Sequence, residues 1–462
     1  MDNPVHNRFL VTETLPPFSE LRRSAAFLTT TKDRRKLLRL AREARDVPTA
    51  PKNCGGKQKG GGMKLRVLAI ALTVALTGVT AAAPAPVTTD VVIGDIDDLT
   101  GVYSDNGGAG AIEAIKMAIA DFGGSVLNRK IVLLTADHQN KADVGASKAR
   151  EWADQRGLNM LLAGANTGVA IAMAKVISAK KVPYFVIGSA GASLVNEDCT
   201  PFSVQYVYNT TALANGTAST IVKSGGKTWF YLTADYTFGT QLQAAASKVV
   251  EANGGKNLGA VRVPLSTSDF SSFLLQAQAS GAQVLGLANA GDDFINSLKS
   301  ANEFGLTQTM KPAGLLVFVN NIDGLGLKTA KGLYLTTAWY WDLNPDTRAF
   351  GKRFFDKTKR EPSMTQSGSY SATMTYLKAV AAAGTTDPEK VMTELKKTKI
   401  NDMFAKGGYI RADGLMIHDM YVMQVKSPQE SKYPWDYYKV VKVMSGEEAF
   451  GPITGLCPLA PK

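Results

Sequence analysis

Two turns rich in hydroxyl-bearing and small residues are the part of the sequence best suited to binding a small anion. Asn166-Thr167-Gly168 lies between a short apolar strand and a helix predicted over 169–179, and Gly188-Ser189-Ala190-Gly191 follows the next predicted strand, 184–187. Ligands of open parallel sheets lie outside the carboxyl ends of the strands, and free N–H groups at helix N-termini attract anions. The pair of turns therefore predicts a carboxylate site; two ordinary tight turns are the alternative interpretation.

Groups that could support catalysis or hold a metal ion are scarce in the sequence. His138 and His418 stand far apart and in no metal-ligand spacing, and 188–191 is one residue short of a G-x-S-x-G motif. The acidic pairs 97–98 and 292–293 are better explained as helix caps or solvated charges. We therefore predict no catalytic residue, no metal and no cofactor, and a binding protein rather than an enzyme.

The formal net charge of +12 is concentrated at the N-terminal end of the 462-residue chain. Residues 1–62 contain 13 basic and 6 acidic residues, and Lys64 and Arg66 add two further positive charges. This leaves a net charge of +3 for residues 84–462. The body of the protein is close to neutral, so its charge does not indicate a nucleic-acid partner.

Residues 63–83 have the pattern of a secretory signal peptide. A basic start, Met63-Lys64-Leu65-Arg66, precedes 13 apolar residues over 67–79 and small residues at 80–83. The apolar run is too short to span a bilayer. We expect residues 1–62 to be a non-native or disordered extension before a start at Met63, and the mature chain to be periplasmic. A cytoplasmic tail on a membrane-anchored protein is the alternative.

Cysteine use fits export to an oxidising compartment. Beyond the predicted signal peptide the chain has two cysteines, Cys199 and Cys457. In an exported protein of this size, two cysteines predict one disulfide, which would tie the C-terminal tail to the loop after the second turn. Two unpaired buried thiols are the alternative.

Strands and helices alternate along the chain from residue 90 onward in two successive blocks of about 120 residues, which predicts two α/β lobes with largely parallel sheets. Three consecutive helices and late antiparallel strands then suggest that the chain re-enters the first lobe and returns to the second. Several crossings of this kind make a hinge beside a cleft. The domains that we expect are 84–208 plus about 342–418 for lobe 1, and 209–341 plus about 419–458 for lobe 2.

Several segments give the chain a clear family resemblance. It resembles the periplasmic substrate-binding proteins of ABC importers, in particular the leucine/isoleucine/valine-binding branch and its aromatic-acid-binding members. The resemblance implies two Rossmann-like lobes joined by a multi-crossing hinge (the type I fold), a permease and an ATPase as partners, and a monomer that binds no nucleic acid. The segments that carry it are DLTGVYSDNGG (98–108), TADHQNKADV (135–144), LTADYTFG (232–239), TSDFSSFLLQAQASGAQVLGLANAG (267–291) and HDMYVMQVK (418–426).

The resemblance also implies a ligand site between the lobes. The two hydroxyl-rich turns would hold the ligand's carboxylate, and aromatic residues of a second-lobe loop would close over its side chain. The expected ligand-binding residues are Tyr103, Asn166, Thr167, Ser189, Ala190, Gly191, Tyr208, Tyr236, Phe238, Asn289 and Phe318.

The chain departs from the family at the position that binds an amino acid's ammonium group. The matching segment, 315–320, has no acidic residue before Asp323. A buried ammonium without a counter-charge costs several kcal/mol. We therefore predict a small aromatic carboxylate as ligand; a branched-chain amino acid, with Asp292 or Asp323 as counter-charge, is the alternative. A ligand-sensing domain and an amide hydrolase-type enzyme on the same fold are further alternatives.

Overall fold

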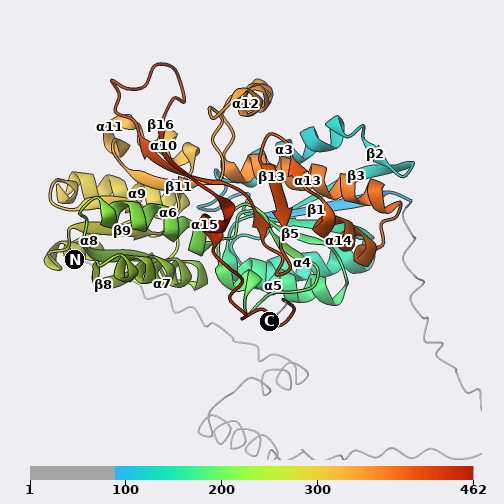
Figure 1. The fold of residues 1–462 in the computed structure, drawn as a ribbon, viewed down its shortest axis with the longest axis horizontal. Helices are drawn as coiled ribbons and strands as arrows, with labels where there is room; N and C mark the ends of the chain where they lie inside the picture. Colours follow the sequence, from blue (N-terminus) through green and yellow to red (C-terminus); the bar gives the residue numbers. More distant parts are fainter. Residues whose placement is uncertain (1–88, 461–462) are drawn as a thin grey trace, which may run out of the picture. The chain divides into compact units, whose positions relative to one another are not determined.

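The computed structural model describes residues 89–460. The predicted signal peptide, 63–83, and the extension before it lie outside the described residues. The described chain forms two α/β lobes, each built around a mostly parallel sheet, as predicted (Figure 1). Among residues 89–460, no helix combines the length and apolar character needed to cross a membrane.

The first lobe is built on a six-stranded sheet with β1 near its centre. Its strand order is β2-β3-β1-β4-β5-β6, and every neighbouring pair is parallel except β2 and β3. The strands are β1 (Val91–Asp97), β2 (Ser125–Val126), β3 (Arg129–Asp137), β4 (Leu158–Ala163), β5 (Tyr184–Val186) and β6 (Ser203–Gln205).

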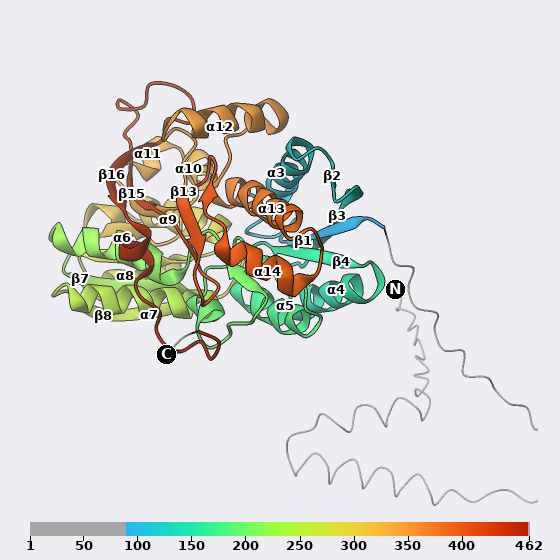
Figure 2. The same cartoon turned by 45° about the vertical axis from the view of Figure 1, so that its right-hand side comes forward.

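Helices cover both faces of this sheet. Val91 and Ile93 of β1 share a core with residues of α3 and α13, whereas Val92 and Ile96 pack with α4 and α5. Alternate residues of β1 therefore face different helix layers, and the strand is buried on both sides. The helices are α3 (Gly108–Asp121), α4 (Ala142–Gln155), α5 (Thr167–Ala179), α13 (Met364–Ala383) and α14 (Pro388–Lys397), and Figure 2 shows α13 and α14 beside the first-lobe elements.

The second lobe contains a seven-stranded sheet in the order β16-β15-β11-β10-β9-β7-β8. β7 to β11 pair in parallel, and β15 and β16 add two antiparallel strands at one edge. The strands are β7 (Thr228–Ala234), β8 (Lys256–Val263), β9 (Val284–Ala288), β10 (Lys311–Gly314), β11 (Tyr334–Thr337), β15 (Met420–Val425) and β16 (Tyr438–Met444). The accompanying helices are α6 (Thr210–Lys223), α7 (Thr237–Ala252), α8 (Ser271–Ala279), α9 (Gly291–Glu303), α10 (Val319–Leu325), α11 (Leu327–Ala330) and α15 (Gly446–Phe450).

Three segments of the described chain connect the large sheets of the two lobes. They lie after β6, between β11 and α12 (Pro345–Thr358), and between β14 (Met416–Ile417) and β15. His418, in the last of these segments, places its ring Nε2 2.9 Å from the carbonyl oxygen of Val207 in the first. This contact joins two of the three connections. The remaining elements are β12 (Ile400–Asn401) and β13 (Lys406–Ile410), which form a small sheet with β14, and the short 3-10 helices η1 (Ala192–Val195) and η2 (Leu306–Gln308).

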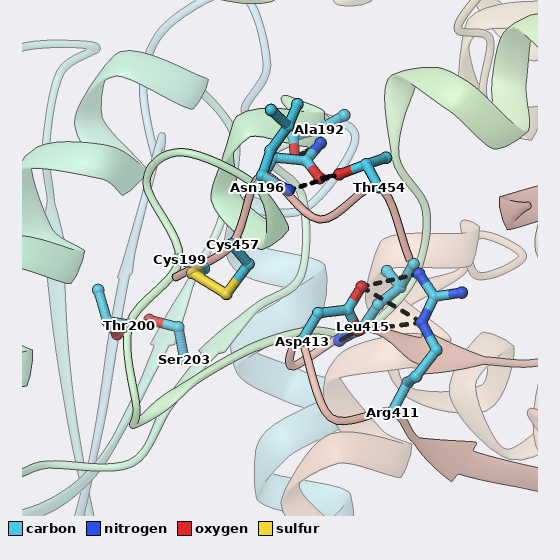
Figure 3. The surroundings of a disulfide bond; sticks show 11 residues. Ala192, Asn196, Cys199, Thr200, Ser203, Arg411, Asp413, Leu415, Thr454 and Cys457 are labelled. Carbon is cyan, nitrogen blue, oxygen red and sulfur yellow. Dashed lines mark hydrogen bonds and ion pairs between the residues drawn. A yellow bond between two sulfur atoms is a disulfide. The ribbon is translucent and has the colours of Figure 1, made fainter. Parts of the chain in front are cut away.

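The predicted disulfide is confirmed. Cys199 and Cys457 are bonded across 258 residues of sequence and tie the C-terminal tail to the loop before β6 (Figure 3). Close by, the Thr454 hydroxyl and the Asn196 side chain are hydrogen-bonded, so the tail is held at two points.

The apolar segment 312–318 forms a strand only in part. β10 ends at Gly314 and α10 begins at Val319. The backbone N–H of Phe318 donates to the Asn321 side chain at 3.0 Å, so this hydrogen bond at the start of α10 replaces strand pairing. Leu316 and Phe318 are thereby released to line the space between the lobes.

Candidate ligand-binding site

A cavity lies between the lobes at the carboxyl ends of the strands. The space that no protein atom fills there is about 490 Å³, a volume that includes the part open to solvent. The turns after β1, β4 and β5 contribute from the first lobe, and the segments after β7, β9 and β10 contribute from the second. A site in this position agrees with the general location of ligands in open α/β sheets.

Most residues predicted to bind the ligand line this cavity. They come from both lobes and from the connection after β6. Those in the lining are Tyr103, Asn166, Thr167, Ala190, Tyr208, Tyr236, Phe238 and Phe318.

The structure places Ser189, Gly191 and Asn289 outside the lining. The Ser189 hydroxyl donates to the carbonyl oxygen of Gly164 at 2.8 Å, and the Gly191 N–H donates to Thr167 Oγ1 at 3.1 Å. The Asn289 amide donates to Ser297 Oγ at 3.0 Å within its own lobe. The polar groups named here bond within the protein and hold the turns and the start of α9 in place.

The N-terminus of α5 supplies hydrogen-bond donors to the cavity. Asn166, with a φ of 79°, accepts the N–H of Val169 through its side chain at 3.2 Å. The first N–H groups of a helix have no acceptor within the helix. Within residues 89–460 those of Thr167 and Gly168 have none elsewhere either, so they remain available, together with the Thr167 hydroxyl, for a negatively charged group.

Aromatic side chains form another part of the wall. The rings of Tyr236 and Phe238 lie 5.8 Å apart, and those of Tyr208 and Phe318 meet edge to face at 6.2 Å. The hydroxyls of Tyr103 and Tyr236 are 2.7 Å apart and join the two lobes. Burial raises the pKa of both tyrosines, so their hydroxyls stay protonated and the wall is uncharged.

Further contacts between the lobes surround the cavity. The N–H of Asp292 donates to the carbonyl oxygen of Val102 at 3.0 Å, and the Asn321 amide donates to the Asn106 side chain at 3.1 Å. The Gln241 amide donates to the Ser193 hydroxyl at 3.0 Å. The lobes are therefore in contact around the cavity, as expected of a closed form.

Two buried acidic residues of β1, which the sequence analysis did not assign to the site, also line the cavity. Asp97 Oδ1 accepts the N–H groups of Asp98 at 2.7 Å and Ala165 at 3.1 Å, and Oδ2 accepts that of Gly108 at 2.9 Å. Burial raises the pKa of Asp97, while His138 and these three N–H groups oppose the rise and favour the ionised carboxylate.

Asp95 lies in the same strand as Asp97, but its carboxyl group is hydrogen-bonded differently. Its Oδ2 atom is buried and has no hydrogen-bond partner among the described residues. Burial, followed by repulsion from Asp97, raises its pKa well above the ordinary value. The signal that could have identified the pair was two acidic residues at alternate positions of an otherwise apolar strand, which places both on one face.

Asp292 and Asp323, the possible counter-charges considered from the sequence, are not among the acidic residues of the cavity. Asp323 accepts the Tyr437 hydroxyl at 2.7 Å, and neither residue is in the lining. Both follow second-lobe strands in the sequence, whereas the acidic residues of the lining, Asp95 and Asp97, belong to the first-lobe strand β1. Among residues 89–460, no group of three or more His, Cys, Asp and Glu side chains is placed to hold a metal ion.

Two α/β lobes that meet around a cavity with hydrogen-bond donors at a helix N-terminus define a class of protein, the two-lobed solute-binding proteins. The chain belongs to the periplasmic binding protein family, because residues 90–432 match the model of that family. The proteins of this family are extracytoplasmic, bind small molecules and are not enzymes.

Solved structures agree with this assignment. A periplasmic binding protein from Burkholderia mallei is 57% identical, with a TM-score of 0.79 over 80% of this chain and 99% of that one. A protein from Burkholderia xenovorans, described as a branched chain amino acid ABC transporter periplasmic ligand-binding protein, is 38% identical, with a TM-score of 0.71 over 79% and 97% of the two chains.

A curated relative is more distant. It is Leu/Ile/Val-binding protein homolog 6 of Brucella melitensis, 24% identical over 260 residues. The match covers 53% of this chain and 64% of the relative.

Proposed function

We propose that this protein is the solute-binding component of an ABC importer and that it binds a small aromatic carboxylate between its lobes. The observation that carries the proposal is the pairing, in one cavity, of the donor-rich N-terminus of α5 with a wall of uncharged aromatic side chains. The N–H groups suit a carboxylate, and the rings suit a flat apolar body.

The remaining steps of import follow from this proposal. The signal peptide at 63–83 directs the chain to the periplasm, where it acts as a monomer. Residues 84–208 with 342–418, and 209–341 with 419–458, close on the solute as two lobes about the connecting segments. The closed form then delivers the solute to a permease that is driven by an ATPase.

A branched-chain amino acid is the second candidate ligand. Two observations favour it: the acidic residues Asp95 and Asp97 in the cavity could face an ammonium group, and the relative from Burkholderia xenovorans carries that description. Against it, Asp97 is already engaged by three N–H groups, and burial opposes ionisation of Asp95.

Thermal-shift and calorimetric titrations would separate the two candidates. Benzoate, 4-hydroxybenzoate and cinnamate would be compared with leucine, isoleucine and valine on the purified protein. A ligand that binds only the native state raises the midpoint of unfolding by mass action. We expect shifts with the aromatic acids alone; shifts with the amino acids alone would contradict the proposed ligand.

A variant that lacks the Thr167 hydroxyl tests the proposed anion site directly. Thr167→Val keeps the shape of the side chain and removes the hydroxyl. A hydrogen bond to a charged group is worth about 1.5–3 kcal/mol, so affinity should fall at least tenfold. Thr217→Val is the matched control, because Thr217 is also buried but bonds Thr336 within the second lobe. If Thr167→Val and Thr217→Val bound the ligand equally tightly, the result would contradict the proposed anion site.

A further inference from the structure

Asp95 is a buried carboxyl group that the protein itself leaves unpaired at the cavity. Its side chain is 2% exposed, it lines the cavity, and its Oδ2 atom has no partner among the described residues. Leaving a buried polar group without a hydrogen bond destabilises a protein unless another molecule supplies the bond. The position of this group is therefore informative about the ligand.

Asp95 lies deeper than the groups that would hold a carboxylate. It precedes Asp97, the last residue of β1, by two positions, which corresponds to about 7 Å along a strand. Both side chains are on the face of β1 that α3 and α13 cover. Those helices contribute Ala111 and Ser369 to the cavity, and such small side chains leave room beside Asp95.

The two carboxyl groups differ in what they can still bind. Asp97 accepts three backbone N–H groups from three segments, so its hydrogen-bonding capacity is largely used. Asp95 Oδ2 has no hydrogen-bond partner in residues 89–460, so the carboxyl group can still bond a ligand. The lining thus has one polar region at the α5 N-terminus and a second one at Asp95.

We propose that Asp95 selects ligands with a hydroxyl group, so that the solute is a small hydroxy-substituted aromatic acid whose carboxylate lies at the α5 N-terminus and whose hydroxyl lies against Asp95. This inference rests on the proposed function and narrows its ligand class. It adds a specificity-determining residue that the comparison with relatives does not supply.

The chemistry of Asp95 favours a hydroxyl over an ammonium group. Burial and the neighbouring charge of Asp97 raise the pKa of the Asp95 carboxyl and so favour its protonated form. A protonated carboxyl group both donates and accepts, and so does a hydroxyl, whereas an ammonium group only donates and needs an ionised partner. A ligand with no polar group at this point would leave Asp95 unpaired and should bind more weakly.

Calorimetric titration of benzoate, 3-hydroxybenzoate, 4-hydroxybenzoate and leucine tests the inference. The wild-type protein should bind at least one hydroxybenzoate tenfold or more tightly than benzoate. Asp95→Asn keeps a donor and an acceptor and should keep most of this preference. Asp95→Leu, which has a similar shape but no polar group, should lose this preference, so that benzoate and the hydroxybenzoates bind it with similar affinities.

A control variant and the remaining outcomes distinguish a failure of the Asp95 inference from a failure of the proposed function. Asp292→Asn changes a carboxylate at the contact between the lobes but outside the lining, and should keep the wild-type preference. Equal binding of benzoate and both hydroxybenzoates by the wild type would overturn the role of Asp95 and leave the proposed function standing. If leucine bound the wild type but not Asp95→Leu, the proposed contact between Asp95 and a ligand hydroxyl would be wrong. Asp95 would then bind the ammonium group of an amino acid. If no aromatic acid binds, the proposed ligand class fails together with the inference.

Discussion

Tyr103 and Tyr236 show how single side chains connect closure to ligand binding. They belong to different lobes, and their hydroxyls form a hydrogen bond of 2.7 Å at the cavity. When the lobes separate, both hydroxyls can bond water instead. The hydrogen bond therefore contributes to the closed form and, through closure, to ligand affinity.

Replacing Tyr236 by phenylalanine should weaken ligand binding about tenfold. The ring stays, but the buried Tyr103 hydroxyl loses its partner in the closed form, which costs about 1–3 kcal/mol. Calorimetry measures the effect. Tyr409→Phe is the control, since Tyr409 bonds Glu447 at an exposed position far from the lining. If Tyr236→Phe bound its ligand as tightly as the control, the hydrogen bond would not contribute to closure.

At the scale of elements, the connection between α12 and α13 contains a buried carboxyl group with an unpaired atom. Glu361 is 8% exposed and its Oε2 has no partner among the described residues. Burial, with a smaller contribution from the charge of Asp342, raises the pKa of Glu361 to about 7. The folded state therefore holds this proton more tightly than the unfolded state, and stability falls as the pH rises through 7.

Glu361→Gln should raise the free energy of unfolding at pH 8 by about 2 kcal/mol, because the variant carries no carboxylate to desolvate. The gain should nearly vanish at pH 4.5, where glutamate is largely protonated in the folded state and half protonated in the unfolded one. Urea unfolding at both pH values measures this. Glu389→Gln, at an exposed position on α14, should show no such difference. A gain that did not depend on pH would contradict the explanation.

For the whole molecule, closure depends on a close backbone approach between the lobes. Gly291, the first residue of α9, has a φ of 61°, and an added Cβ would lie 2.1 Å from the carbonyl oxygen of Val102 in the other lobe. The neighbouring N–H, of Asp292, donates to that same oxygen. A side chain at position 291 is thus incompatible with the closed form.

Gly291→Ala should weaken ligand binding by more than tenfold and favour the open form, which small-angle scattering would detect as a larger radius of gyration with ligand present. Gly305→Ala is the matched control. Its φ is 69°, so the backbone strain is similar, but the nearest atom to an added Cβ is a side-chain nitrogen of Gln308 at 3.7 Å in the same lobe. Compact scattering of ligand-bound Gly291→Ala would contradict the role of this contact.

The sequence by itself determined the features that depend on local pattern. Alternating strands and helices predicted two α/β lobes because apolar periodicity and turn residues act within short segments. Cys199 and Cys457 predicted the disulfide, since no other cysteine follows the predicted signal peptide. The two hydroxyl-rich turns indicated where the cavity would lie, because the carboxyl ends of parallel strands share one edge.

Only the tertiary structure decided which polar groups face the ligand. Ser189 and Asn289 resembled binding residues in sequence, yet their side chains bond within the protein. Asp95 lies within an otherwise apolar strand and had no assigned role, yet it lines the cavity. The direction of a side chain and the pairing of its polar atoms depend on neighbours that are distant in sequence, and the packing of α3 and α13 against β1 brings those neighbours together.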